Sequence, residues 1–335
     1  MIVITGGAGF IGSNIVQRLS WMGETNLLVV DNLGVPKIPA HPKFMNLSGA
    51  RVTNYMDKVE FREALKSGAF DDVKIRAILH QGACSDTLED DGRYMMDNNF
   101  TYSKEVLHFA LDREIPLVYA STAATYGLST KFAEAEVNER PLNIYGYSKL
   151  VFDNYVRKLM PTIKSTVVGL RYFNVYGKRE QHKGRMSSVI HHFAKQLTDT
   201  GTIRMFAGSG GYGDGEQRRD FVFVDDLVDI NLFFAGLVPD SPVEPVQAVV
   251  NAGTGAAHTF NEVAHAVMNV LGQGKIEYIP FPADLENRYQ HFTEADIAAL
   301  RRAGYTKDFH NIEEGVRKTL GPELWIERLE AMMKD

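Results

Sequence analysis

The stretch that decides the fold is residues 1–21, MIVITGGAGFIGSNIVQRLSW. An apolar run, Met1–Ile4, leads directly into TGGAGFIG, and the following residues place Ile15, Val16 and Leu19 on one face of a predicted helix. A strand, a glycine-rich turn and a helix in this order are the context that a dinucleotide-binding fingerprint requires. The glycines let the backbone approach a pyrophosphate, and the helix N-terminus offers free N–H groups to it. On its own, the glycine repeat would also suit an ordinary strand-to-helix turn.

The segments that follow continue the alternation of strand and helix. A second apolar run, Leu27–Val30, ends in Asp31, about 20 residues after the glycine turn, where an acidic side chain meets the adenosine ribose of a bound dinucleotide. This alternation predicts an α/β fold, a doubly wound parallel Rossmann sheet. Further strands and helices are predicted in turn, up to about residue 175, at 77–80, 94–111, 117–120, 145–160 and 166–170.

The pattern loosens in the second half of the chain. We expect residues 1–175 to form a dinucleotide-binding Rossmann domain and residues 176–335 to form mainly a smaller, mixed α/β substrate-binding lobe. Segments at about 220–260 are expected to return to the first domain. In open α/β sheets the ligand lies beyond the carboxyl ends of the strands, so the cleft between the lobes is the expected site. Helices are predicted in the second half at 187–197, 261–271, 293–303 and 311–320.

Composition excludes several classes of protein. The chain of 335 residues carries a net charge of −6, with 44% hydrophobic and 23% charged residues, as in an ordinary globular protein. There is no basic stripe for nucleic acid, and no stretch approaches the ~18 apolar residues of a membrane span. A single cysteine, Cys84, cannot form an intrachain disulfide, and no signal segment opens the chain, which together favour the cytoplasm. No spacing of histidines indicates a metal site.

The strongest chemical signal is the pair Tyr145 and Lys149, four residues apart on one face of the helix predicted at 145–160. A tyrosine serves as acid or base near neutral pH only if its pKa falls below the usual ~10, and a neighbouring ammonium favours the phenolate. Thr122, in the loop after the strand at 117–120, could polarise a substrate oxygen while Tyr145 moves the proton. The alternative interpretation is a chance pair on a solvated helix and a hydroxyl bonded to backbone.

Taken together, the fingerprint TGGAGFIG, the loop STAATYG and the YxxxK pair resemble the extended short-chain dehydrogenase/reductase family. Members of that family mostly act on nucleotide sugars. A serine or threonine after the fourth strand works with the tyrosine in that family, and Thr122 matches it. Family dehydratases carry Asp-Glu directly after this residue. This chain has Ala123-Ala124 instead, which argues against dehydration.

Other stretches, including HQGACSDT, GRYMMDNNF, REQHKGRMSSV and RYQHFT, resemble one subfamily, the ADP-glyceromanno-heptose 6-epimerases. The resemblance runs from residue 1 to about residue 320. It implies inversion at C6 of the heptose in ADP-heptose, for the inner core of lipopolysaccharide, through transient oxidation to a 6-ketone and reduction on the opposite face. It also implies a homo-oligomer, mostly a pentamer.

Inverting a secondary alcohol in this way calls for proton groups on two sides of the carbon. Tyr145 would be one, and the resemblance implies that Lys183, in His182-Lys183-Gly184, is the second. From the residues alone, Lys183 is a loop lysine in a polar stretch. To act as a base it would need a lowered pKa, through partial burial or through nearby cations such as Arg185.

Cofactor preference depends on opposing charges. Asp31 alone favours NAD, because a carboxylate repels a 2′-phosphate. The resemblance implies NADP, with Lys43 and Lys58 neutralising that phosphate, so we expect NADP, with NAD possible. By resemblance, the cofactor contacts fall on Gly6, Gly9, Phe10, Ile11, Gly12, Asp31, Asn32, Lys43, Lys58, Gln81, Gly82, Ala83, Ser85, Asn98, Tyr145, Lys149, Val175 and Lys183.

The substrate diphosphate needs cations, and Arg219 and Arg185 are the candidates. Arg218 adjoins Arg219, so the sequence does not decide which of them faces inward. By resemblance, the substrate contacts fall on Ser121, Asn174, Arg185, His192, Phe206, Ala207, Gly208, Ser209, Arg219 and Tyr289.

Two alternatives stay open. Another nucleotide-sugar epimerase or reductase, such as a UDP-sugar 4-epimerase that relies on tyrosine alone, would not require Lys183. A non-catalytic NADP-binding regulator would be expected to have lost part of the Thr-Tyr-Lys set. Here Thr122, Tyr145 and Lys149 are all present.

Overall fold

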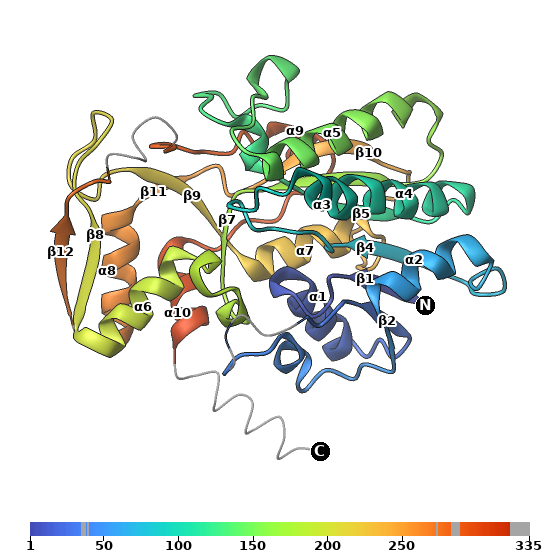
Figure 1. Cartoon of the computed structure of the whole chain (residues 1–335), viewed down its shortest axis with the longest axis horizontal. Helices are drawn as coiled ribbons and strands as arrows, with labels where there is room; N and C mark the ends of the chain where they lie inside the picture. The colour runs from blue at the N-terminus through green and yellow to red at the C-terminus, as the bar shows by residue number, and fades with distance from the viewer. Residues whose placement is uncertain (35–37, 39, 273, 283–288, 322–335) are drawn as a thin grey trace.

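A computed structural model describes residues 1–34, 38, 40–272, 274–282 and 289–321 (Figure 1). Residues 322–335, the last part of the lobe predicted at 176–335, lie outside the described residues. Within the described ranges, no helix combines the length and the apolar character needed to cross a bilayer.

The larger part of the molecule is built on a seven-stranded sheet with the order β10-β6-β5-β4-β1-β2-β3. Every neighbouring pair in it is parallel, which confirms the predicted Rossmann-type α/β fold. The central strands β1, β2 and β4 are short apolar runs buried on both faces, as parallel sheets require, whereas the edge strand β3 is largely exposed. They are β1 (Ile2–Thr5), β2 (Leu27–Val30), β3 (Asn54–Met56), β4 (Ala77–His80), β5 (Leu117–Thr122), β6 (Val167–Tyr172) and β10 (Gln247–Ala252).

Helices cover both faces of this sheet, because successive strand side chains point to opposite sides. Ile2 and Ile4 pack in one apolar cluster with α1 (Phe10–Trp21) and α7 (Val224–Phe234), whereas Val3 packs in the cluster of the other face. Three helices lie on that second face: α2 (Lys58–Ser67), α4 (Tyr102–Asp112) and α5 (Ile144–Leu159).

A smaller group of elements lies to one side of the main sheet (Figure 1). It holds a three-stranded sheet with the order β11-β9-β7 and a parallel pair, β8 and β12, around a third apolar cluster. β10 and α7, from the second half of the sequence, belong to the main sheet and its covering layer. The bounds are β7 (Asn174–Tyr176), β8 (Thr202–Phe206), β9 (Arg218–Phe223), β11 (Ala257–Thr259), β12 (Lys275–Ile279), α6 (Val189–Thr200), α8 (Phe260–Leu271), α9 (Ala298–Arg302) and α10 (Ile312–Leu320).

Two predicted helices differ from the structure. The helix expected at 94–111 is α3 (Gly92–Met96), a π-helical turn at Asp97–Thr101, and then α4. The helix expected at 293–303 is confined to α9, because the backbone N–H of Ala295 is hydrogen-bonded to the carboxylate of Asp220 and not within a helix.

Candidate active site

The glycine turn between β1 and α1 packs against its surroundings too closely for side chains. A Cβ on Gly6, whose φ is +63°, would lie 2.7 Å from the backbone nitrogen of Gly82. A Cβ on Gly12 would lie 2.2 Å from the carbonyl oxygen of Gly6. The helix N-cap, Gly9, makes no side-chain cap, and the first turn, which begins with Phe10 and Ile11, has no acidic residue. This close-packed, positively polarised cradle fits the pyrophosphate of a dinucleotide.

A carboxylate and an ammonium meet at the end of β2. Buried Asp31 accepts hydrogen bonds from the backbone N–H groups of Ala8 (3.1 Å) and Leu33 (3.0 Å). The ammonium of Lys43 donates to Asp31 Oδ1 and to Asn32 Oδ1, both at 3.0 Å. The structure therefore brings Asp31, Asn32 and Lys43 together, and the lysine offsets the carboxylate charge that would otherwise oppose a phosphate.

Lys58 and Asn98 form a second polar pair. Lys58 Nζ donates to Asn98 Oδ1 at 2.7 Å, and Asn98 lies in the π-helical turn. The next residue, Asn99, is fully buried and holds the backbone of Cys84 from both sides, at 2.8 and 2.9 Å. Asn99 thus fixes the segment that carries Ala83 and Ser85, both of which are exposed. The sequence analysis missed Asn99, because the π-helical turn that contains it is a feature of the structure. Such turns often mark a functional site.

Gln81 was predicted to contact the cofactor, but its side chain is directed elsewhere. Its Nε2 donates to Asn231 Oδ1 and its Oε1 accepts from the hydroxyl of Tyr172, both at 2.9 Å. The backbone of Gln81 still lies against Gly6, and Gly82 N donates to Thr5 Oγ1 at 3.0 Å. Only the backbone of this turn therefore faces the glycine cradle.

The predicted proton-transfer set assembles where β5 ends and α5 begins. The Thr122 hydroxyl lies near the phenol of Tyr145 and favours a lower pKa there, but burial outweighs this effect and raises the pKa of Tyr145 overall. Lys149 is buried, and its Nζ donates to the carbonyl of Ala120 at 2.8 Å. The expectation that Lys149 depresses the Tyr145 pKa is therefore wrong here, since the ammonium is directed to a backbone carbonyl. Burial lowers the pKa of Lys149 itself to about 8.

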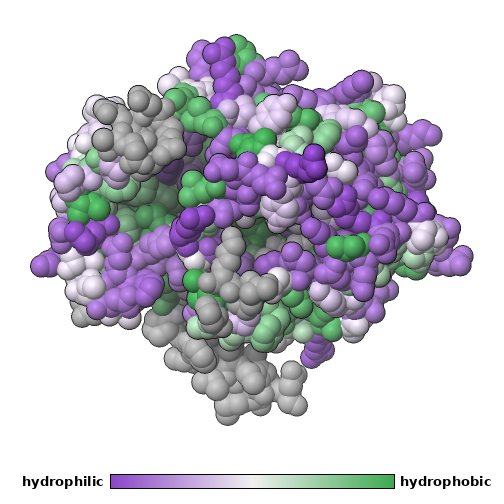
Figure 2. Space-filling model, viewed as in Figure 1, coloured by the Kyte–Doolittle hydropathy of each residue, from purple (hydrophilic) through white to green (hydrophobic). Residues whose placement is uncertain are grey.

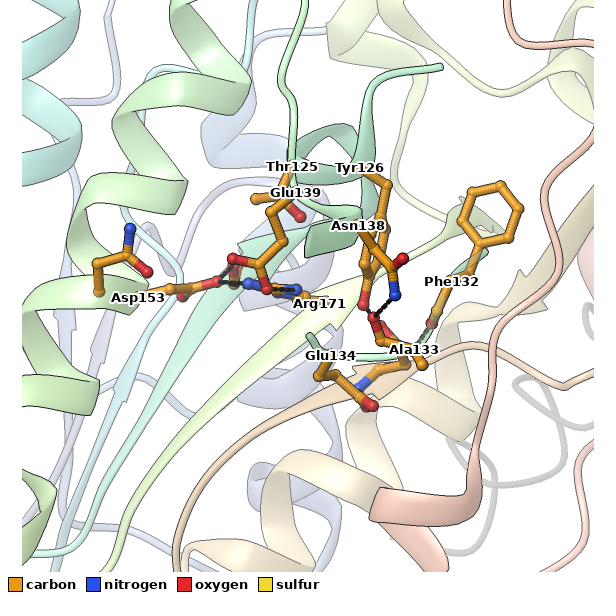
Figure 3. Close-up of polar contacts among 12 residues, drawn as sticks. Thr125, Tyr126, Phe132, Ala133, Glu134, Asn138, Glu139, Asp153 and Arg171 are labelled. Carbon is orange, nitrogen blue, oxygen red and sulfur yellow. Dashed lines mark hydrogen bonds and ion pairs between the residues drawn. The ribbon is translucent and has the colours of Figure 1, made fainter. Parts of the chain in front are cut away.

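Ser121 was predicted to contact substrate, yet its hydroxyl donates to Asp153 Oδ2 at 2.8 Å and is buried. Asp153 belongs to a buried ionic cluster in which it and Glu139 converge on Arg171, at 2.9 and 2.7 Å (Figure 3). Arg157 also pairs with Glu139 at 2.7 Å. The cluster ties β5, β6 and α5 together directly behind the Thr122 loop, so it supports the site without facing it.

Lys183 lies in a 3-10 turn, Gln181–Met186, that follows β7. Its Nζ sits 5.2 Å from the centre of the Phe10 ring, next to the glycine turn. Burial lowers the pKa of Lys183, and the carboxylate of Glu180 opposes this shift. Of the two causes expected for a lowered Lys183 pKa, burial therefore acts, whereas Arg185 is exposed and pairs with Asp86 at 3.3 Å.

The remaining contacts predicted near β7 lie on different elements. Val175 is partly buried in β7, and Asn174 at its start is exposed and accepts a 3.5 Å hydrogen bond from Thr293. His192, on α6, places its Nε2 3.3 Å from the carbonyl oxygen of Arg185. Arg185 and His192 are therefore neighbours.

Arg219, and not Arg218, faces inward from β9. The Arg219 guanidinium is buried, 4.9 Å from the centre of the Tyr289 ring and 5.8 Å from that of Phe260. Within the described parts of the chain no carboxylate forms an ion pair with it, and burial lowers its pKa. A buried cation walled by aromatic rings is suited to an anionic ligand.

The next residue of β9, Asp220, points into the protein interior. Asp220 is fully buried and accepts hydrogen bonds from the backbone N–H groups of Thr254 (2.8 Å), Gly255 (2.9 Å) and Ala295 (3.0 Å). Adjacent strand residues point to opposite faces, so the strand register sends Arg219 to the ligand side and Asp220 to the backbone side.

The predicted substrate segment Phe206–Ser209 lies beside Arg219 and Tyr289. Gln217 Nε2 donates to the Ala207 carbonyl at 3.0 Å and to Ser209 Oγ at 3.1 Å, and the Phe206 and Tyr289 rings meet edge to face at 6.4 Å. This face of the molecule is hollowed over β8 and β9 (Figure 2).

The sequence analysis missed three aromatic residues in this region. His291 Nε2 lies 3.1 Å from Ser209 Oγ and the ring of Tyr212 stacks on His291, while Phe281 meets Tyr289 at 5.1 Å. His291 is the fourth residue of the stretch RYQHFT, which could have suggested it. Among the residues that the structure describes, no cluster of histidine, cysteine, aspartate and glutamate could hold a metal ion.

Comparison with known proteins agrees with this fold. The model of the NAD dependent epimerase/dehydratase family matches residues 2–253, and the chain belongs to that family. It is 51% identical over 320 residues, 96% of each chain, to the ADP-L-glycero-D-manno-heptose-6-epimerase of Alkalilimnicola ehrlichii. The crystal structure of the Helicobacter pylori ADP-L-glycero-D-manno-heptose-6-epimerase is similar over 95% of this chain and 94% of that one, with 29% identity and a TM-score of 0.79. A Thermus thermophilus UDP-glucose 4-epimerase in complex with NAD is similar over 95% of this chain and 97% of its own, with 27% identity and a TM-score of 0.72.

Proposed function

We propose that this protein converts ADP-D-glycero-D-manno-heptose to ADP-L-glycero-D-manno-heptose, as the name of the 51% identical relative suggests. One observation carries the proposal beyond the family. A complete Thr122–Tyr145–Lys149 set is accompanied by a second, partly buried amine, that of Lys183, beside the glycine turn. An enzyme that inverts a secondary alcohol can use a proton group on each face of the carbon.

The residues divide the work at the C6 oxygen. The nicotinamide ring of the cofactor, when bound, supplies a hydride acceptor and donor. Tyr145 is proposed to take the proton on one face as a phenolate, which requires a lower pKa than burial alone gives it, while Thr122 orients the oxygen through its hydroxyl. Lys183 serves the other face, where its lowered pKa makes a neutral amine accessible closer to neutral pH.

Arg219 is proposed to bind the substrate diphosphate. Among the described residues no carboxylate pairs with its buried guanidinium, so an incoming anion would supply the counter-charge, and Tyr289 and Phe206 supply apolar ring faces beside it. Ser209 and Ala207, held by Gln217, offer polar atoms for the nucleotide.

We propose NADP as the preferred cofactor. Lys43 already lies at hydrogen-bond distance from Asp31 and Asn32, so a 2′-phosphate at this point would meet an ammonium as well as a carboxylate. Lys58, paired with Asn98, supplies a second cation. A cytoplasmic homo-oligomer, a pentamer by resemblance, completes the proposal, and light scattering after size-exclusion chromatography measures its size.

The test is to incubate the purified protein with each ADP-heptose epimer separately, without added cofactor, and to follow the heptose configuration by NMR. Both epimers should reach the same mixture, with no net absorbance change of the nicotinamide. Steady accumulation of reduced cofactor would identify a dehydrogenase. Inertness toward ADP-heptose with turnover of UDP-glucose would identify a 4-epimerase.

A further inference from the structure

The turn that carries Lys183 is tied to the cofactor-binding half by two asparagine side chains. We call residues 178–186 the lysine loop. Asn14, on α1, donates from Nδ2 to the carbonyl oxygens of Phe10 and Lys178, both at 2.9 Å. Its Oδ1 accepts from Arg179 Nη1 at 2.7 Å. The start of the lysine loop is therefore fixed to the first turns of α1.

The second tie reaches the glycine turn itself. Asn46 is buried, and its Nδ2 lies 3.0 Å from the carbonyl oxygen of Ala8 and 3.0 Å from His182 Nδ1. Gln17 Nε2 donates to the Asn46 carbonyl at 3.4 Å. A single amide nitrogen thus joins the backbone of the glycine turn to the residue directly before Lys183.

The identity of the donor in these hydrogen bonds follows from the chemistry of the atoms. The Ala8 carbonyl can only accept, so the amide atom facing it is the nitrogen, and the same nitrogen donates to His182 Nδ1. His182 must therefore be neutral, with its proton on Nε2. Burial and the nearby cations Lys43 and Lys183 lower the pKa of His182 to about 4, which keeps the ring neutral at physiological pH.

The lysine loop also has internal support that does not depend on the cofactor half. The buried carboxylate of Glu180 accepts from Gly177 N at 3.3 Å and from the Ser188 hydroxyl at 2.7 Å, so it spans both ends of the loop. Its position over Phe10 depends in addition on contacts with the cofactor half, which are the hydrogen bonds of Asn14, the Asn46–His182 hydrogen bond and the exposed ion pair of Arg185 with Asp86.

We propose that Asn46 and His182 are positioning residues that hold the Lys183 ammonium over the glycine turn and thereby slow the release of the dinucleotide. The role of Lys183 as a base rests on the function proposed above, whereas the effect on cofactor release does not. The ligand concerned is a nicotinamide dinucleotide, of which the pyrophosphate would lie between the glycine turn and the loop.

Variants separate the hydrogen bond from the bulk of the side chain. His182→Leu removes the acceptor, whereas His182→Asn keeps an acceptor close to the Nδ1 position. Asn46→Asp keeps the size of the side chain but removes the donor. Gln181→Leu changes an exposed neighbour in the same loop and is the matched control.

Two measurements follow the tie without relying on epimerase activity. NADPH and NADH dissociation is followed by fluorescence, and acylation of Lys183 by acetic anhydride is followed by mass spectrometry. We expect His182→Leu and Asn46→Asp to raise both rates about tenfold, the effect of one net hydrogen bond. His182→Asn should restore most of the parent rates, and Gln181→Leu should match the parent.

The outcomes are distinct. Parent-like rates of dissociation and acylation in both His182→Leu and Asn46→Asp would overturn the proposal. Equal increases of these rates in His182→Asn and His182→Leu would also overturn it. If the parent protein fails to convert ADP-heptose but the rates change as expected, the proposed reaction is wrong and the positioning role stands. In an active enzyme the same variants should lower kcat and leave the KM for ADP-heptose unchanged.

Discussion

Tyr145 and Lys183, the two residues proposed to move protons, are held by different kinds of structure. Tyr145 projects from the first turn of α5, against the end of β5, in the part of the molecule where the central sheet fixes the backbone. Lys183 lies in a short turn whose position depends on side-chain hydrogen bonds from Asn14 and Asn46. A catalytic side chain that is positioned by a sheet and a helix is insensitive to single substitutions around it. A side chain that is positioned by other side chains can be displaced by a single substitution.

The largest expected effect comes from removing either proton group. Tyr145→Phe and Lys183→Met should each lower kcat by about 10²–10⁴-fold, the usual contribution of an acid or base. Both should still bind NADP and ADP-heptose. Stopped assays of heptose configuration measure the rates, with Tyr147→Phe and Lys131→Met, both exposed, as controls. A parent-like rate in Lys183→Met would leave Tyr145 to serve both faces.

A residue outside both proton-transfer regions should behave differently. Arg219→Gln removes the buried cation, and a charge-assisted hydrogen bond contributes roughly 1.5–3 kcal/mol. We therefore expect the KM for ADP-heptose to rise about 10–150-fold, with a smaller change in kcat. Arg218→Gln is the matched control, since Arg218 is partly exposed. Equal changes of the KM in the two variants would show that the inward orientation of Arg219 does not determine substrate binding.

Cofactor discrimination gives a smaller effect. Replacing both Lys43 and Lys58 by alanine should weaken NADP binding about tenfold or more per lost contact, with little change for NAD. Calorimetric titration with each dinucleotide measures the difference. Equal losses for NADP and NAD would mean that Asp31 sets the preference.

The last prediction concerns acid stability and compares one histidine from each region. Burial lowers the pKa of His80, near Lys149, to about 3 and that of His182 to about 4. Both folded-state values lie below the unfolded value, so each contributes stability that is complete above pH ~6.5 and is lost as pH falls toward the folded pKa. The loss is at most about 1.4 kcal/mol per pH unit from each histidine.

Unfolding in urea at several pH values tests this. His80→Asn should flatten the decline in the free energy of unfolding down to about pH 3, and His182→Asn only down to about pH 4. An unchanged slope in both variants would mean that other groups dominate acid unfolding.

The backbone-determined half of the site could be predicted from the sequence. The glycine turn, Asp31 and the pair Tyr145 and Lys149 follow from strand and helix periodicity, which depends on neighbours close in the chain. The sequence did not reveal α7, because that helix is buried on almost every side and only Asp225 and Asp229 are partly exposed.

Side-chain direction was the part that could not be predicted. Gln81 and Ser121 occupy the expected places in the chain, but partners distant in sequence, Asn231 and Asp153, orient their polar atoms away from the cleft. The same is true of Lys149, whose ammonium is directed to Ala120. The orientations of these side chains depend on tertiary contacts, so no local pattern in the sequence indicates them.

The alternation of Arg219 and Asp220 along β9 limits how this protein can evolve. An insertion or deletion of one residue within the strand would exchange the two, placing a carboxylate among the aromatic rings and a guanidinium against backbone N–H groups. Changes in chain length are therefore better tolerated outside the strand, for example in the mostly exposed turn at residues 210–214 that links β8 to β9. Attempts to alter the accepted sugar nucleotide should vary the length of that turn and leave the strand intact.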